Sequence, residues 1–203
     1  MIATGIMLIV KRCMDIFGGG LVLLLTAPIL ALGCCLVLVT MGRPIFFRQT
    51  RIGRGEQPFT LVKLRTMSIG DDDDAARLTP VGRFLRASSI DELPSLVQVL
   101  AGDMSLVGPR PLLPAYLELY DNRQRRRHEV KPGLTGLAQI AGRNQIDWAD
   151  RLELDVRYVE THAPLVDLAI LAKTPWAVLS SRGIAADGHA TMPSFEGNPK
   201  CDC

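Results

Sequence analysis

The sequence predicts an α+β fold, in which a small mixed α/β domain follows an N-terminal membrane element. An apolar run from Ile16 to Met41, broken near its middle by Pro28, indicates the membrane element. After it, short β-prone pieces alternate with helix-start signals, which indicates a mixed domain. The 203 residues suit one domain with a sizeable core, and we place the membrane segment at 1–42, the domain at 43–188 and a flexible tail at 189–203.

The apolar run has cationic residues at both ends. Lys11 and Arg12 precede it, and Arg43, Arg48, Arg51 and Arg54 follow it. As one helix it would extend about 39 Å, enough to cross a hydrocarbon core of about 30 Å. Because Lys and Arg favour the cytoplasmic side, cations at both ends predict a re-entrant helix hairpin that turns at Pro28. One kinked spanning helix is the alternative. We also expect interfacial amphipathic helices.

Composition and charge narrow the classes of partner. The net charge is only +2, yet basic residues gather beside the apolar run and again between 123 and 131. Such clusters favour anionic lipid surfaces or phosphate ligands. Nucleic acid is disfavoured, because only 5% of residues are aromatic and no base-stacking or groove-reading motif is present. The five cysteines lack metal-ligand spacing, so we expect reduced thiols.

Local signals predict the elements of the domain. Strands are expected at 46–47 and 59–64, on the two sides of a glycine turn, and at 104–107. Helices are expected to start at Thr79-Pro80 and near 88–94. Further helices are expected to cover 116–127, 148–159 and 165–179. The last of these helices could pack on the core or lie on the membrane surface. The aspartates 71–74 lack the interleaved spacing of a metal site and indicate a solvated loop.

Asp91 and Glu92 fall in or beside the first turn of a predicted helix. Adjacent helical side chains point about 100° apart, so the two carboxylates cannot share one proton but can serve two points of one reaction. An Asp at a helix N-terminus is held ionised, which favours metal binding or nucleophilic attack. Simple helix capping would explain the pair as well.

Cationic residues around this pair indicate a phosphate ligand. Arg110 lies between two prolines, which stiffen the backbone under a guanidinium suited to phosphate oxygens. The glycine-rich stretches 131–136 and 142–144, with Arg143, add backbone amides and charge. Lys63 could join them or point outward from a strand. Together these residues predict a site in which carboxylates, Mg²⁺ and cations surround a polyphosphate.

Four motifs stand in order along the chain. They are Lys63-Leu64-Arg65-Thr66-Met67; Leu85-Arg86 with Ser89-Ile90-Asp91-Glu92-Leu93-Pro94; Gly102-Asp103-Met104-Ser105-Leu106-Val107-Gly108-Pro109-Arg110-Pro111; and Lys131-Pro132-Gly133-Leu134-Thr135-Gly136 with Ala138-Gln139 and Gly142-Arg143-Asn144. This combination resembles the monotopic phosphoglycosyl transferases, bacterial sugar transferases that begin glycan assembly on a polyprenyl phosphate. The resemblance extends over 11–188, and the chain looks like the minimal catalytic unit.

The resemblance implies a two-step transfer. Asp91 would attack the β-phosphate of a UDP-sugar, release UMP and hold the phosphosugar, which polyprenyl (undecaprenyl) phosphate would then accept. Glu92 would be a neighbouring base or orienting group, Mg²⁺ would bind near Asp91, and Arg110, Arg143 and Lys63 would bind phosphate. The implied location is the bacterial inner membrane, with the site on the cytoplasmic face and membrane lipid and a second copy as possible partners. No residue favours one sugar.

The chain departs from the family pattern at three places. Ala27 stands where relatives often have Ser before the proline, so Thr26 is the expected support for freed carbonyls. Leu137 stands where Trp is common, and Lys131 where Arg is common. Two rival functions remain: a membrane-anchored interaction protein without catalysis, and a spanning enzyme that works outside the cytoplasm. The intact carboxylates and Arg110 argue against the first.

Overall fold

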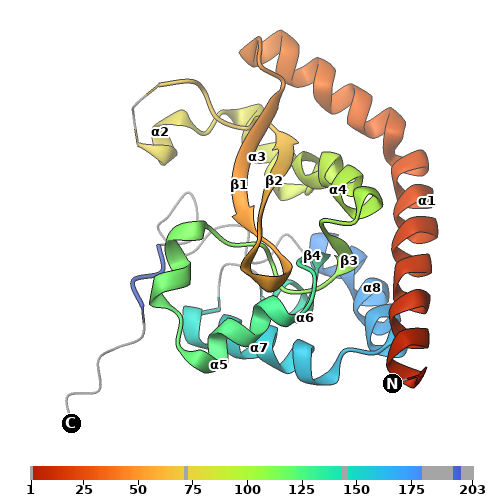
Figure 1. Cartoon of the computed structure of the whole chain (residues 1–203). Helices are drawn as coiled ribbons and strands as arrows, with labels where there is room; N and C mark the ends of the chain where they lie inside the picture. The colour runs from red at the N-terminus through yellow and green to blue at the C-terminus, as the bar shows by residue number, and fades with distance from the viewer. Residues whose placement is uncertain (1, 71–72, 143–145, 180–193, 198–203) are drawn as a thin grey trace.

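The computed structural model describes residues 2–70, 73–142, 146–179 and 194–197. One long helix runs along a body of short helices and two small sheets, which confirms the mixed helix and sheet class (Figure 1). The α-helices are α1 (Ile2–Met41), α2 (Asp74–Arg77), α3 (Pro80–Ala87), α4 (Leu96–Ala101), α5 (Asn122–Arg125), α6 (Leu137–Ala141), α7 (Trp148–Thr161) and α8 (Pro164–Leu179). The 3₁₀ helices are η1 (Arg54–Glu56), η2 (Ile90–Ser95), η3 (Pro114–Leu119) and η4 (Arg126–Glu129).

Two pairs of strands form the sheets. Strands β1 (Phe46–Ile52) and β2 (Pro58–Leu64) make the predicted antiparallel hairpin, with Phe46 opposite Leu64. Strands β3 (Ser105–Val107) and β4 (Gly133–Thr135) pair in parallel, and β4 was not predicted. An added Cβ at Gly133 would lie 2.0 Å from the amide nitrogen of Gly108, so this pairing needs glycine rather than the β-branched residues that identify strands.

Helix α1 passes through Pro28 as one bent helix rather than as two antiparallel arms (Figure 1). Proline frees the carbonyl four residues earlier, which is that of Leu24. The expectation that Thr26 supports this carbonyl is wrong, because its hydroxyl donates to the carbonyl of Val22 at 2.7 Å. The re-entrant course through a bilayer stays a prediction.

The first part of α1 is bound to the body by buried charges. The Lys11 ammonium donates to Asp167 Oδ2 at 2.6 Å and to the Tyr158 hydroxyl and the Val107 carbonyl at 3.0 Å each. One turn later, the Asp15 carboxylate accepts from the Ser105 hydroxyl. These bonds tie the start of the apolar run to α8, α7 and β3.

The last part of α1 is bound to the other side of the body. The Arg65 guanidinium donates to the carbonyls of Met41 at 2.6 Å and Gly42 at 2.8 Å, and so satisfies groups left open at the helix C-terminus. Val37 is fully buried against Leu64 and Leu85. Both ends of the apolar run therefore belong to the same folded body.

Much of the remaining surface of α1 is apolar and exposed. Exposed residues include Phe17, Leu24, Leu25 and Val39. Within the described residues, Gly5–Met41 is the one helix long and apolar enough to cross a membrane. An exposed apolar surface of this extent is typical of a membrane or partner contact.

Helix α8 packs on the core, one of the two positions that the sequence left open, and also has an exposed apolar face. Ile170 is buried in the core, whereas Leu165, Leu168 and Trp176 are exposed. Contact of this apolar face with lipid stays a prediction.

Part of the predicted flexible tail is packed. Phe195 is buried, with its ring centroid 5.3 Å from that of Trp148 and 5.8 Å from that of Tyr116. The flexible-tail prediction is therefore wrong for 194–197, because an aromatic cluster on η3 and α7 binds this segment. The rest of 189–203 lies outside the described residues.

The Lys11→Met variant should lose stability, because it leaves the Asp167 carboxylate buried without its cation. Breaking a buried pair costs about 3 kcal/mol, which lowers Tm by roughly 6–12 °C for a chain of this size. Thermal unfolding in one detergent measures the change. The control is Lys173→Met at an exposed position of α8, and equal Tm values for the two variants would contradict this account.

Candidate active site

The two neighbouring carboxylates of the predicted site lie on η2, between α3 and α4. Ser89, just before η2, adopts a left-handed conformation with φ 57°, which turns the chain into the site. The expected position in a first helical turn is confirmed, but the helix is a 3₁₀ helix, and the α-helix α4 begins only at Leu96. Pro94 has no amide to donate to the carbonyl of Ile90, so an α-helical bond cannot close there.

Glu92 is held by two cations. Its carboxylate accepts from Lys63 Nζ at 2.6 Å and from Arg110 Nη2 at 2.6 Å. Burial alone would raise the pKa of Glu92, but the charges of Arg110 and Lys63 outweigh it and hold the pKa well below the usual range. Glu92 is therefore a fixed anion at neutral pH.

Asp91 has different surroundings from its neighbour. It is buried, and its carboxylate accepts no hydrogen bond within the described part of the chain. Burial and then the charge of Glu92 raise the pKa of Asp91 to about 6, despite Lys63, Arg86 and Arg110 nearby. The pKa of Asp91 is therefore shifted upwards, against the downward shift that a helix dipole would cause. Desolvation dominates, and it leaves a carboxylate that is ionised at neutral pH and free to react.

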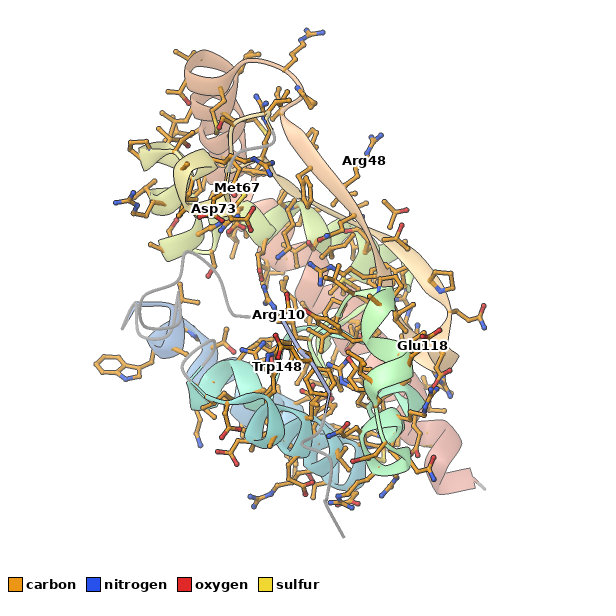
Figure 2. All side chains as sticks on the ribbon, turned by 90° about the vertical axis from the view of Figure 1, so that its left-hand side faces the viewer. Arg48, Met67, Asp73, Arg110, Glu118 and Trp148 are labelled. Carbon is orange, nitrogen blue, oxygen red and sulfur yellow. The ribbon has the colours of Figure 1, made fainter. Side chains whose placement is uncertain are left out.

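Arg110 is held through its backbone as well as through its side-chain bond to Glu92. Its backbone carbonyl accepts from Arg127 Nη2 at 2.6 Å, and Arg127 forms an ion pair of 2.6 Å with Asp155. Both members of that pair are almost fully buried. In Figure 2, Arg110 lies near the centre of the body, whereas Arg48 projects away from it. The site thus holds its guanidinium at a defined position.

An open cleft of about 290 Å³ lies beside these groups. Its lining includes polar and apolar side chains, and the residues are Arg51, Leu61, Lys63, Glu92, Ser95, Met104, Arg110, Pro111, Gly133 and Leu134. Arg51 was predicted only as a cation beside the membrane run. Strand alternation could have identified it, because Arg51 lies opposite Phe59 and on the same face as Lys63.

The structure brings together four of the five predicted site residues. They are Asp91, Glu92, Arg110 and Lys63. Arg143 lies outside the described residues. The alternative that Lys63 points outward is excluded by its bond to Glu92, whereas Arg65 caps α1 instead.

The described residues test whether the aspartate run forms a solvated loop and whether any group of side chains could hold a metal. Asp73 and Asp74 are exposed, as expected, but Asp74 begins the short helix α2 rather than lying in a loop, and it lies 3.7 Å from Arg77. Asp71 and Asp72 lie outside the described residues. The described residues contain no group of three or more acidic, His or Cys side chains that could hold a metal. Mg²⁺ often uses one or two carboxylates plus substrate phosphates, and Asp91 fits that need.

Comparison with known proteins identifies the family. The model of the family described as bacterial sugar transferase matches residues 6–181. The chain belongs to the bacterial sugar transferase family. The resemblance found in the sequence is thereby confirmed, and with it the prediction that the chain is a transferase enzyme.

This bacterial sugar transferase is similar over most of its length to several named proteins. It is 48% identical over 197 residues to the uncharacterized sugar transferase EpsL of Bacillus subtilis. The aligned region covers 94% of this chain and 98% of EpsL. It is 41% identical over 187 residues to the UDP-glucose:undecaprenyl-phosphate glucose-1-phosphate transferase of Caulobacter vibrioides, covering 84% of this chain and 70% of that protein. The Escherichia coli protein of the same name is 38% identical over 192 residues, which are 84% of this chain and 40% of that protein. Such relatives and the exposed apolar helix support membrane association of this transferase.

Proposed function

We propose that this bacterial sugar transferase moves a phosphosugar from a UDP-sugar to undecaprenyl phosphate, through a covalent intermediate on Asp91. The names of the Caulobacter and Escherichia coli relatives support the substrate class. The observation that carries the proposal is the contrast between the two carboxylates. Glu92 is bound by two cations, while Asp91 is buried beside them without a hydrogen bond in the described residues.

Asp91 acts as the nucleophile in the first step. One carboxylate oxygen attacks the β-phosphorus of the donor, the bond from that phosphorus to the bridging oxygen breaks, and UMP leaves with the electron pair. The phosphosugar is then an acyl phosphate on Asp91. In the second step a phosphate oxygen of undecaprenyl phosphate attacks the same phosphorus, and the carboxylate of Asp91 is released.

Glu92 acts as an orienting group rather than as a base. A carboxylate whose pKa is held far below the usual range takes up protons poorly at neutral pH. Its bonds instead fix the positions of Lys63 and Arg110. These two cations stabilise the negative charge on the transferred phosphoryl group.

Mg²⁺ is the proposed cofactor, and Asp91 would hold it together with the diphosphate of the donor. When bound, it neutralises charge on the diphosphate. The residues of the chain supply the nucleophile, the fixed cations and the cleft.

The two attachments of α1 support a re-entrant course. Lys11 binds α8 and β3, and Arg65 caps the other end, so both ends lie on one body. A helix that spanned the bilayer would have to detach one of them. We infer that α1 enters and leaves the inner membrane through the cytoplasmic face, where UDP-sugars are available.

The Asp91→Asn variant should lose UMP release from a UDP-sugar by at least about 10³-fold, because an amide is a poor nucleophile. The assay contains purified protein, a UDP-sugar panel, Mg²⁺ and undecaprenyl phosphate. Chelation should abolish release, and added Mg²⁺ should restore it. The matched control is Asp74→Asn on the exposed α2, which should remain active. Equal activity of Asp91→Asn and wild type would remove Asp91 as the nucleophile.

The rate of UMP release should rise with pH. Burial raises the pKa of Asp91 to about 6, so the group is mostly protonated at pH 5 and mostly ionised above pH 7. Because only the carboxylate attacks, kcat/KM should climb through about pH 6 and then level off. In Glu92→Gln the rise should move to lower pH, since a like charge is removed. A rise that stays at the same pH in that variant would contradict the assignment.

Both ends of the apolar run should be accessible from the cytoplasm. Cys13 is exposed just before the run, and Arg43→Cys marks its end. In a background without other cysteines, an impermeant maleimide should label both positions in inverted vesicles and neither in intact cells. Labelling of the two positions from opposite sides would support a spanning helix instead.

A further inference from the structure

A guanidinium outside the predicted site faces the same cleft. Arg51 lies on β1 opposite Phe59, and it lines the cleft together with Lys63, Glu92 and Arg110. Strand alternation places Arg51 on the face that also presents Lys63. Arg48 is an exposed cation of the same strand on the opposite face (Figure 2).

Arg51 has few partners of its own. Its Nη2 donates to the side chain of Gln49 at 2.6 Å, and its Nη1 reaches the Pro111 carbonyl only at 3.5 Å. Its Nε is buried without a hydrogen bond. In the part of the chain that the structure describes, no carboxylate lies within ion-pair distance of Arg51. Glu92, which lines the same cleft, is bound by Lys63 and Arg110 instead.

The cleft therefore has more positive than negative charge. Arg51, Lys63 and Arg110 face Glu92. Asp91 also acts on Lys63 and Arg110, and Asp155, which Arg127 binds, acts on Arg110. A partly buried cation without an anion is costly, and a bound anionic ligand removes that cost. Burial and then the charge of Arg110 lower the pKa of Arg51 to about 10, so it stays protonated at neutral pH.

Arg110 connects Arg51 with the carboxylate pair. It lines the cleft beside Arg51, and its guanidinium binds Glu92, the neighbour of Asp91. Its charge also lowers the pKa of both Asp91 and Arg51. Arg110 therefore lies close to both the nucleophile and Arg51.

We propose that Arg51 binds the α-phosphate of the donor and stabilises the leaving UMP, an inference that rests on the proposed function. The β-phosphorus must lie at Asp91, so the α-phosphate extends past Arg110 towards Arg51. As the bond to the bridging oxygen breaks, negative charge develops on UMP, and a fixed guanidinium stabilises it. The second step, which begins after UMP has left, does not use Arg51.

Inhibition by UMP and by uridine separates a phosphate contact from a general effect on the site. Charge-assisted hydrogen bonds of this kind correspond to about 10–100-fold in affinity. Arg51→Met should weaken inhibition by UMP by about that factor and leave inhibition by uridine unchanged. Arg51→Lys should lie between Arg51→Met and wild type. The control Arg48→Met should match wild type for both ligands.

The two half-reactions give a second readout. Arg51→Met should slow the first UMP release in a single turnover, whereas transfer from preformed intermediate to undecaprenyl phosphate should keep its wild-type rate. Wild-type inhibition by UMP, an equal loss for UMP and uridine, or a slowed transfer step would each overturn the inference. If Arg51→Met does not fold, Arg51→Lys decides by the same criteria.

The outcomes for Arg51 and Asp91 remain distinguishable. If Asp91→Asn is inactive and Arg51→Met behaves as wild type, only the role of Arg51 is ruled out. An active Asp91→Asn would remove the proposed function itself.

Discussion

The paired bonds to Glu92 are the interaction on which the site depends. One half-buried carboxylate accepts from Lys63 on β2 and from Arg110 in the loop after β3, so it ties η2 to two other segments of the chain. The same bonds keep Glu92 ionised and leave its neighbour Asp91 without a cation of its own. Two adjacent and chemically identical groups thereby become different, because burial dominates for one and ion pairing for the other.

The long helix gives this site its place at a membrane. Buried polar bonds hold both ends of α1 to the body, while an apolar surface between them stays exposed. The proposed soluble donor and lipid acceptor can meet only where water and hydrocarbon adjoin. The helix and the cleft are parts of one rigid arrangement, so the orientation of the helix in lipid also sets the orientation of the cleft.

Local patterns in the sequence predicted much of this structure. The hairpin of β1 and β2, the Thr79 cap and four site residues follow from alternation, capping chemistry and motifs. Strand β4 was not predicted, because its Gly133 is needed for backbone contact and gives no strand signal. Arg51 was missed although strand alternation places it on the same face as Lys63. Phe195 was missed because its partners come from distant parts of the chain, which no local pattern shows.

The close contact between β3 and β4 has a consequence for how the cleft is held. An added Cβ at Gly136 would lie 2.3 Å from the Gly108 carbonyl oxygen, so main chain rather than side chain sets the spacing next to Arg110. The apolar residues of the cleft, Leu61, Met104 and Leu134, belong to the hydrophobic core or pack against it. The fold thus sets the charged wall of the cleft by backbone contact and its apolar wall by core packing.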